Sequence, residues 1–309
     1  MACDAPYRDR GFVLVNALII VAALAGAAVF LLARADAGRV RLQTEQSAGQ
    51  LGYYLDAFEA LSVTLLNQDM QGGDVDHPGE DWAKADYNVP LDRGQVSGVI
   101  TDMQGLFNLN WLTDPTNLSA PEAFDLLLAR NGISPSTGDA IRAFMQPGGP
   151  RNRQIYAASR PALDPVGGAL FSIEQLADIP NLAPDDLAKL KQVATVLPGD
   201  SKININMIPA DILAGFVPQV RPAALSAVLI TRTRVPFTSV DAFMEALNIA
   251  AGQDLSEDVD ASRFSVASDW FGVRISAELQ GQTASRTSVL RRFTAPTGTV
   301  IYWHSSSYR

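Results

Sequence analysis

The sequence predicts an α+β protein that consists of a long N-terminal helix, a small sheet and a large helical insertion. Three observations lead to this fold class. An apolar run over residues 12–33 passes without a break into a polar helical pattern over residues 34–66. Segments that favour strands lie before residue 118 and after residue 263, and helical patterns fill the chain between them. Strands on both sides of a helical block indicate one sheet whose chain is interrupted by that block.

The bulk composition is that of a globular protein that can bury a core by packing alone. The chain has 309 residues, 47% of them hydrophobic, and a net charge of −9. This acidic balance argues against broad binding of nucleic acid, which requires a basic face. Cys3 is the single cysteine, so no intramolecular disulfide can form. His77 and His304 are far apart in the sequence, and we interpret them as surface or sheet histidines rather than a metal pair.

The N-terminal apolar run is long enough to cross a membrane. It extends from Phe12 to Ala33 and is broken only by Asn16, and about 20 helical residues span a hydrocarbon core of roughly 30 Å. Basic residues flank the run on both sides, so their distribution does not decide its orientation. The leader before the run is too short to fold on the far side of a membrane. We therefore expect a single-pass protein whose N-terminus lies in the cytoplasm.

The N-terminal residues fit some kinds of N-terminal signal better than others. A secretory signal peptide has a shorter apolar region and a small-x-small cleavage site, and a lipoprotein signal has a hydrophobic stretch before its cysteine, which Cys3 lacks. A plain membrane anchor is an alternative that stays open. The segment from Arg8 to Val15 fits a fourth type in more detail, because it resembles a type IV prepilin leader. Its charged residues end in Gly11, and an apolar helix starts at Phe12.

That resemblance implies processing at two adjacent residues. A prepilin peptidase would cut between Gly11 and Phe12 and methylate the new amino group of Phe12. Glycine suits the position, because it exposes an unhindered and flexible backbone to a protease. Most prepilins carry glutamate as the fifth residue after the cut, and this chain has Asn16 there. A neutral amide cannot pair at full charge with the N-terminal ammonium of a neighbouring subunit, so Asn16 favours a place at the end of a filament. The alternative is a tolerated polar residue near a helix start.

The chain between the stalk and the helical block predicts the first strands. Residues 67–92 are polar and rich in glycine and aspartate, which predicts an irregular connection. The β-prone segments Val99–Thr101 and Leu106–Trp111 lie on either side of Gly105. They predict two short strands that pair with each other.

The remaining chain first predicts helices and then strands again. Apolar-periodic segments that often begin with Ser, Thr or Pro cover residues 120–129, 137–145, 172–176, 184–193, 208–213, 221–232 and 239–247. Residues 146–164 predict a loop rich in Pro, Gly and Arg. Closing strands are predicted for residues 271–279, 289–293 and 300–303, the last two joined by a hairpin turn at Pro296–Gly298.

The order of these elements resembles the K-type minor pseudopilins of bacterial type II secretion (GspK-like) over essentially the whole chain. The segments that carry the resemblance are 102–110, 171–176, 195–199, 202–206, 232–243 and 264–271. The resemblance implies a pilin-like fold with a small antiparallel sheet. Its divisions are a leader (1–11), a transmembrane helix (12–33), a helical stalk (34–66), a first strand region (67–118), a helical insertion with two SAM-like segments (119–262) and closing strands (263–309).

The resemblance also implies a structural, non-enzymatic role. K-type members form the tip of the type II secretion pseudopilus, where they prime assembly and support export of folded proteins across the outer membrane. The implied partners are the I- and J-type minor pseudopilins, the major pseudopilin below the tip and the prepilin peptidase, with no nucleic acid. The implied location is the bacterial inner membrane, with the C-terminal domain in the periplasm. Asn16 agrees with this family, whose K-type members typically lack the glutamate.

The resemblance does not supply a cofactor. Some family members bind calcium in the helical insertion through acidic residues around a Trp-Ile-Asp-x-Asp segment. The corresponding residues 141–148 of this chain contain no carboxylate, and a hard cation needs several oxygen ligands. We therefore expect no cofactor from this segment, and the sequence leaves metal ligands unassigned.

Other functions are less well supported by the residues. Residues 202–213 and 232–237 also resemble helix-hairpin-helix DNA-binding modules, which need a Gly-x-Gly hairpin that approaches phosphates. In residues 215–222 two prolines remove donors, and Phe216 and Val217 hinder that approach. A minor pilin of a type IV pilus is a further alternative, against which the large helical insertion argues. The sequence has no zinc-protease helix motif, phosphate-binding glycine loop or serine elbow, so we expect no enzyme.

Overall fold

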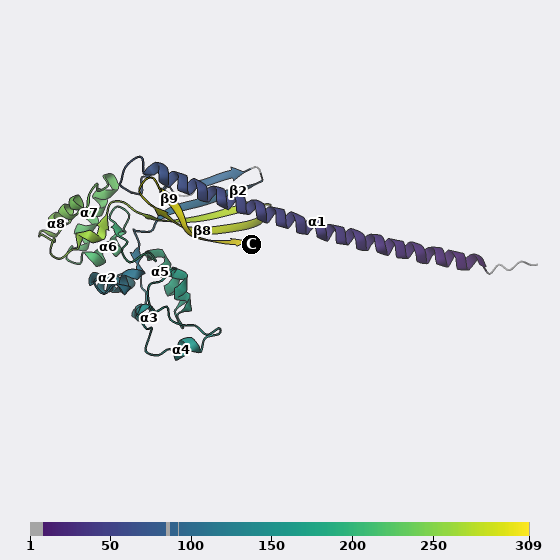
Figure 1. Cartoon of the computed structure of the whole chain (residues 1–309), viewed down its shortest axis with the longest axis horizontal. Coiled ribbons are helices and arrows are strands. Elements are labelled where there is room, and N and C mark those ends of the chain that lie inside the picture. Colours follow the sequence, from purple (N-terminus) through teal and green to yellow (C-terminus); the bar gives the residue numbers. More distant parts are fainter. Residues whose placement is uncertain (1–8, 85–86, 92, 309) are drawn as a thin grey trace, which may run out of the picture.

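The computed structural model describes residues 9–84, 87–91 and 93–308 (Figure 1). It has an α+β fold with three parts: one long helix, a five-stranded antiparallel sheet and a helical unit. The sheet lies against the second half of the long helix, and the helical unit lies beyond the sheet, away from the N-terminal end of that helix. The predicted fold class is confirmed.

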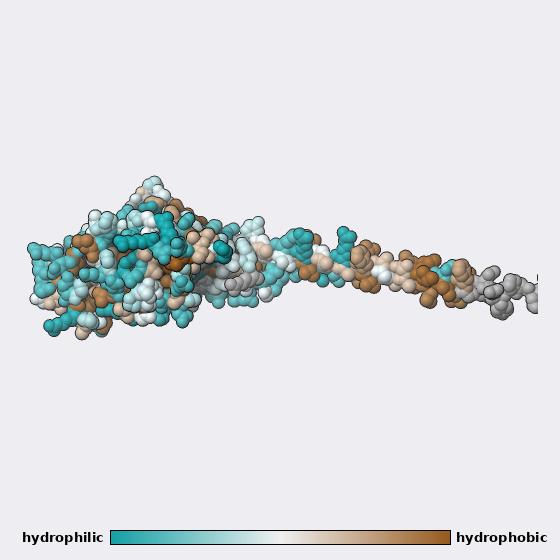
Figure 2. All heavy atoms as spheres, turned by 90° about the horizontal axis from the view of Figure 1, so that it is seen from below, coloured by the Kyte–Doolittle hydropathy of each residue, from teal (hydrophilic) through white to brown (hydrophobic). Residues whose placement is uncertain are grey.

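Helix α1 (Asp9–Asp69) has two parts with different surroundings. Residues 12–46 are exposed throughout, and a long apolar surface covers the first turns of this bare part (Figure 2). Burial begins at Ser47, where one side of the helix meets the sheet. Spacings of three and four place the buried apolar residues on one face of the helix. They are Leu51, Leu55, Phe58 and Leu66.

The sheet is formed by strands from both sides of the helical unit. In spatial order it contains β1 (Tyr87–Leu91), β2 (Gly94–Asp102), β7 (Trp270–Leu279), β8 (Gln282–Arg292) and β9 (Thr299–Tyr308). The central pair is β2 and β7, in which Asp102 lies opposite Phe271. Alternate residues of β7 are buried, so one face of the strand packs toward α1. The prediction of one sheet interrupted by a helical block is confirmed, and so is the turn at Pro296–Gly298, where the N–H of Phe293 donates to the carbonyl of Gly298 at 3.1 Å.

The predicted pairing of the two early strands is wrong. Residues Val99–Thr101 belong to β2, which pairs with β1 and β7 instead of with residues 106–111. In that second segment, β3 (Phe107–Asn108) pairs in parallel with β4 (Ala194–Thr195), and a 3₁₀ helix η1 (Leu109–Thr113) follows. The alternating apolar side chains of this segment are buried, but in the core of the helical unit rather than on a sheet.

Two segments predicted as irregular also contain regular elements. Strand β1 forms within residues 67–92, because it gains a partner in β2. The short helix α4 (Gln154–Ala157) forms within residues 146–164, where Tyr156 is buried against Phe144 with ring centroids 6.0 Å apart. Composition alone did not reveal either tertiary contact.

The helical unit contains most of the predicted helices. Its elements are α2 (Ser119–Arg130), α3 (Pro135–Met145), α4, α5 (Pro184–Val193), α6 (Ala210–Phe216), α7 (Pro222–Arg234), α8 (Val240–Ala251), the 3₁₀ helices η2 (Ile173–Asp178) and η3 (Ala261–Arg263), and the parallel pair β5 (Ile203–Asn204) and β6 (Phe264–Ser265). Proline begins α3, α5 and α7, because its fixed φ suits the first helical position and its missing N–H needs no partner there. The segment at 172–176, predicted as helical, is the 3₁₀ helix η2.

The two parts of the globular region have separate hydrophobic cores. The core between α1 and the sheet includes Phe58, Trp82 and Phe271. The core of the helical unit is larger, and its buried rings include Phe107, Phe124, Phe144, Phe216 and Phe243. Because residues 12–46 belong to neither core, a fragment of residues 40–309 retains both cores.

Candidate functional site

The three N-terminal residues singled out by the sequence all lie in α1. Gly11 and Phe12 are in its first turn, Phe12 is 70% exposed, and Asn16 is exposed one turn further on. Within the described residues, the helix over Phe12–Asp69 is long and apolar enough to cross a membrane by length and composition. Most of the predicted leader, residues 1–8, lies outside the described residues. Cleavage and methylation at Gly11 and Phe12 therefore stay predictions.

The chain crosses between the sheet and the helical unit at two neighbouring points. It leaves the sheet after Asp102 and returns at Trp270. The buried side chain of Gln104 joins these points, because its Nε2 donates to the carbonyl of Lys202 at 2.8 Å and its Oε1 accepts from the N–H of Asp269 at 2.6 Å. One amide thus holds together the outgoing chain, the returning chain and the residue just before β5.

Two Asn-x-Asn motifs occupy equivalent places in the helical unit. The first motif, Asn108 and Asn110, starts at the last residue of β3, and the second, Asn204 and Asn206, starts at the last residue of β5. All four side chains are buried. In each motif, the Oδ1 of the first asparagine accepts from the backbone N–H of the second. The distances are 3.1 Å in the first motif and 2.8 Å in the second. The same tight turn therefore follows both strands.

The side chain of the second asparagine in each motif binds both the backbone N–H and the backbone carbonyl of one distant residue. Asn110 accepts from the N–H of Leu170 at 2.7 Å and donates to its carbonyl at 3.0 Å. Asn206 accepts from the N–H of Phe237 at 2.9 Å and donates to its carbonyl at 3.0 Å. A primary amide can do this because it carries one acceptor and two donors. The helical unit is therefore built from two halves with the same anchoring contact.

The hairpin that resembled a DNA-binding module is folded into the core. Phe216, the last residue of α6, and Val217, which follows it, are buried. Arg232 on α7 donates to the carbonyl of Ile208 at 2.8 Å, and burial lowers the pKa of its guanidinium to about 10. This basic group binds the backbone of its own chain, so the geometry does not favour a phosphate cradle.

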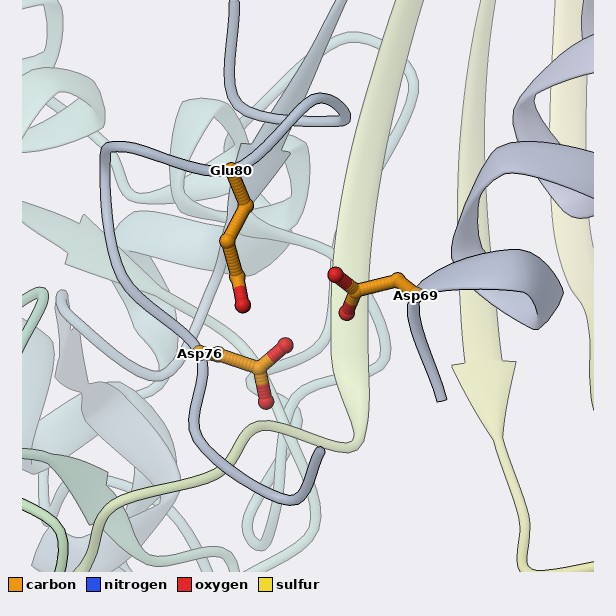
Figure 3. A group of neighbouring side chains, drawn as sticks. All are labelled: Asp69, Asp76 and Glu80. Atoms are coloured by element: carbon orange, nitrogen blue, oxygen red, sulfur yellow. The ribbon is translucent and has the colours of Figure 1, made fainter. Parts of the chain in front are cut away.

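Three carboxylates converge where α1 ends (Figure 3). Asp69 is the last residue of α1, and Asp76 and Glu80 belong to the loop that follows. One oxygen of each residue lies within 4.8 Å of those of the other two, and we call these three residues the acidic cluster. Arg292, the last residue of β8, faces it: Nη1 lies 2.9 Å from Asp69 Oδ2, and Nη2 pairs with Asp76 Oδ2. The sequence did not reveal the cluster, because its residues lie in a segment that composition marks only as irregular.

Burial makes negative charge costly around the cluster. Burial raises the pKa of Asp76, although the charge of Arg292 opposes the shift. Burial also raises the pKa of Glu80 to about 7. On β2, full burial raises the pKa of Asp102 to about 7, and the negative charge of Asp76 acts in the same direction. The region therefore carries more carboxylates than its one facing guanidinium can neutralise.

A second buried ionic group lies between α1 and the sheet. Arg286 on β8 places its Nη1 2.7 Å from Asp56 and 3.0 Å from Glu59, both on α1. His304 on β9 places its Nδ1 3.0 Å from the same Glu59. The other histidine, His77, accepts from the N–H of Gly79 at 3.0 Å. The two histidines thus have different partners, and they do not contact each other in these interactions.

Residues 141–148, for which the sequence predicts no calcium ligands, lie at the end of α3 and just beyond it. Phe144 and Met145 are buried. The nearby Arg142 forms ion pairs with Asp125 and with Asp139, the latter at 3.3 Å. Neither of these carboxylates belongs to residues 141–148.

Comparison with known proteins gives a consistent result. A family model described as type II secretion system (T2SS), protein K, matches residues 203–267. Type II secretion system protein K of Pectobacterium carotovorum subsp. carotovorum is 23% identical over 308 residues, which cover 92% of each chain. The protein of the same name from Aeromonas hydrophila is 30% identical over 114 residues, 35% of this chain and 33% of that one. This chain is therefore similar to type II secretion system protein K over most of its length. The predicted K-type resemblance is confirmed.

The fold of this chain also matches a solved structure. That structure is the GspK-GspI-GspJ complex from the type 2 secretion system of enterotoxigenic Escherichia coli. The TM-score is 0.71 at 22% identity, over 86% of this chain and 99% of the other. The family match at 203–267 runs from β5 to just beyond β6, so it covers the second Asn-x-Asn half of the helical unit.

Proposed function

We propose that this chain caps the tip of the type II secretion pseudopilus, primes its assembly and supports export of folded proteins across the outer membrane. The observation that carries the proposal is the helical unit inserted between β2 and β7. It lies beyond the sheet, away from the N-terminal end of α1 (Figure 1). A subunit inside a helical filament must leave room for the next subunit, whereas a cap has no such limit.

The bare part of α1 supports the same role. Within it, the exposed residues 12–33 form a long apolar surface (Figure 2), which needs a partner in a membrane or among other helices. We propose that this part anchors the chain once in the inner membrane, with the N-terminus in the cytoplasm and the globular region in the periplasm. In the assembled pseudopilus it packs against the helices of neighbouring pseudopilins.

The proposed partners follow from the related complex. GspK of enterotoxigenic Escherichia coli was crystallised with GspI and GspJ. We propose that the I- and J-type minor pseudopilins bind this chain in the same way and that the major pseudopilin adds below them. Asn16 supports a position at the end of the filament, because its neutral amide offers no full charge to the N-terminal ammonium of a neighbouring subunit.

The cap can be tested by removing the helical unit at its base. Because Asp102 lies opposite Phe271 in the sheet, a two-residue Asn-Gly turn can replace residues 103–270 and join β2 to β7 as a hairpin. Immunogold labelling of extended pseudopili is expected to find the intact chain at filament ends and the shortened chain along the shaft. Circular dichroism of the shortened protein checks that it folds. The control is Phe171→Ala, at a side chain 92% exposed on the helical unit, which is expected to keep the terminal position.

An intact chain distributed along the shaft would contradict the cap. A shortened chain that folds and still occupies only the ends would show that the helical unit does not determine the position.

We also propose that prepilin peptidase cuts between Gly11 and Phe12 and methylates Phe12. Gly11→Val is expected to block maturation, because a branched side chain hinders access to the bond. Gly26→Val is the matched control, since Gly26 lies on the same bare helix and an added Cβ there would meet nothing within 4 Å. N-terminal sequencing and intact mass of the wild-type protein are expected to show methylated Phe12 as the first residue. Normal maturation of Gly11→Val would exclude this processing site.

A further inference from the structure

We propose that Asp69, Asp76 and Glu80 bind a hard divalent cation of the calcium type. The site lies at the junction of α1, the following loop and β8. It is separate from residues 141–148, for which the sequence predicts no calcium ligands. The inference does not depend on the proposed place of the chain in the pseudopilus.

The geometry of the acidic cluster suits one shared cation. Calcium binds oxygen at about 2.3–2.6 Å, so two oxygens on opposite sides of one ion are separated by up to roughly 5 Å. One oxygen from each of the three carboxylates lies within 4.8 Å of the other two. Figure 3 shows the carboxyl groups of Asp69, Asp76 and Glu80 approaching one another from three directions. A central ion can therefore contact all three without a large change of backbone.

Asp76 carries the second observation that points to a ligand. Its side chain is 1% exposed, and its Oδ2 accepts from the N–H of Ser268 at 2.6 Å and pairs with Arg292. Its Oδ1 is buried and has no hydrogen-bond partner. A buried carboxylate oxygen without a partner is costly, and a cation would satisfy it.

Charge around the cluster favours an added cation. Arg292 binds the Oδ2 atoms of Asp69 and Asp76, so one guanidinium faces three carboxyl groups. Glu80 accepts hydrogen bonds from the N–H of His77 at 3.0 Å and from Trp82 Nε1 at 2.7 Å, and in the described part of the chain it forms no ion pair. The last turn of α1 has no basic residue, although the carbonyl end of a helix attracts positive charge.

The ligand types select the class of ion. Carboxylate oxygens on a flexible loop suit calcium, which accepts six to eight oxygens in variable geometry. Magnesium requires a smaller, nearly octahedral site, and zinc favours nitrogen and sulfur ligands. Three carboxylates supply part of the shell, and water can supply the rest. We therefore expect calcium to bind more tightly than magnesium.

Binding would connect the end of α1 to the helical unit. The N–H of Asp76 donates to the carbonyl of Val266 at 2.9 Å, and the carbonyl of Asp76 accepts from Asn204 Nδ2 at 3.2 Å. Asp76 is therefore already attached to both β5 and the returning chain. A cation shared with Asp69 would fix that attachment to the last turn of the stalk helix.

The test uses residues 40–309, which retain both hydrophobic cores. After treatment with EDTA, calcium chloride is titrated by calorimetry and the thermal unfolding midpoint is followed in parallel. Extracellular calcium sites have dissociation constants of about 10⁻⁴ to 10⁻³ M, and a value in this range is expected. Terbium luminescence excited through Trp82, whose Nε1 donates to Glu80, gives a local readout.

Matched variants locate the site. Glu80→Gln and Asp69→Asn are each expected to weaken calcium binding at least about tenfold, and circular dichroism confirms their folding. Glu278→Gln is the control, because Glu278 is an exposed carboxylate on β7 that contacts Gln95. It is expected to leave calcium affinity unchanged. If one of the two cluster variants does not fold, the calcium affinity of the other tests the proposal.

Two results would overturn the proposal. The first is no heat and no rise in the unfolding midpoint up to about 10 mM calcium, well above the expected range. The second is calcium binding that persists unchanged in both Glu80→Gln and Asp69→Asn, which would place the ion elsewhere.

Discussion

The sheet part and the helical unit bury their polar side chains by different chemistry. Between α1 and the sheet, the buried groups form ion pairs, which are Arg286 with Glu59 and Arg292 with Asp76. In the helical unit, the corresponding groups are neutral amides, which are Asn108, Asn110, Asn204 and Asn206. An ion left unpaired in a protein interior costs far more than an unpaired amide. The stability of the sheet part should therefore depend on charge and pH, and that of the helical unit on hydrogen-bond geometry.

The largest effect is expected from breaking an ion pair of the sheet part. Arg286→Ala removes the guanidinium 3.0 Å from Glu59, whose side chain is 5% exposed. Loss of one partner leaves a buried charge, so the free energy of unfolding of residues 40–309 should fall by about 3–5 kcal/mol. Denaturant unfolding measures the change. Arg274→Ala, at an exposed position of the neighbouring strand, serves as control and should change it by less than about 0.5 kcal/mol.

A smaller loss is expected from removing an anchoring amide of the helical unit. Asn110→Ala leaves the N–H and carbonyl of Leu170 without their partner, and Asn206→Ala does the same for Phe237. Each unpaired buried group costs about 1–3 kcal/mol. Asn110→Ala should be the more damaging, since the contact with Leu170 is fully buried and that with Phe237 is only partly buried. Equal losses at pH 5 and pH 8 would fit neutral amides, and a strong pH dependence would contradict the comparison.

Asp102 should make the sheet part less stable as the pH rises. Burial raises its pKa to about 7 from an ordinary value of 3.8. The folded state therefore keeps a proton that the unfolded chain releases, and this contribution to stability is present below pH 4 and is lost as pH rises to about 7. Asp102→Asn removes the titration, so its stability relative to the wild type should rise by about 2–3 kcal/mol between pH 5 and pH 8. Denaturant unfolding of both proteins in EDTA at pH 5 and pH 8 measures the difference in their free energies of unfolding. The same difference at both pH values would contradict the raised pKa of Asp102.

The smallest effect is expected on the bare part of α1. Arg41 and Glu45 form an exposed ion pair at 3.1 Å, one turn before the helix reaches the sheet. Exposed pairs of this kind contribute little, and neither residue belongs to a core. Arg41→Ala should leave the unfolding midpoint of residues 40–309 unchanged. A clear loss would show that the bare part is coupled to the globular region.

The fold class and most helices could be predicted from the sequence because they follow local patterns. Apolar residues at every second position predicted β7, and apolar residues spaced three to four apart predicted the helices of the helical unit. Proline predicted several helix starts. The pairing of early strands was not predictable in this way. Gly105 indicated a hairpin break, but its position is set by close approach, since a Cβ there would lie 2.9 Å from the backbone of Met207. That contact joins the chain between β2 and β3 to the residue that follows the second Asn-x-Asn motif.

The candidate sites differ in how far the sequence revealed them. The Asn-x-Asn motifs were visible as family markers, but their partners Leu170 and Phe237 are too distant in the chain to infer. The acidic cluster was not visible at all. Its carboxylates are separated by seven and four residues without a known motif, and Arg292 meets them only because β8 ends beside the last turn of α1. Tertiary contact creates the site.

The central claim is that this chain assembles with its minor partners at the tip. The most direct measurement is size-exclusion chromatography with light scattering on residues 40–309 mixed with the soluble regions of the I- and J-type minor pseudopilins. Co-elution of all three as a single 1:1:1 species is predicted. Elution of this chain as a monomer, at concentrations where the I and J types associate with each other, would contradict the claim.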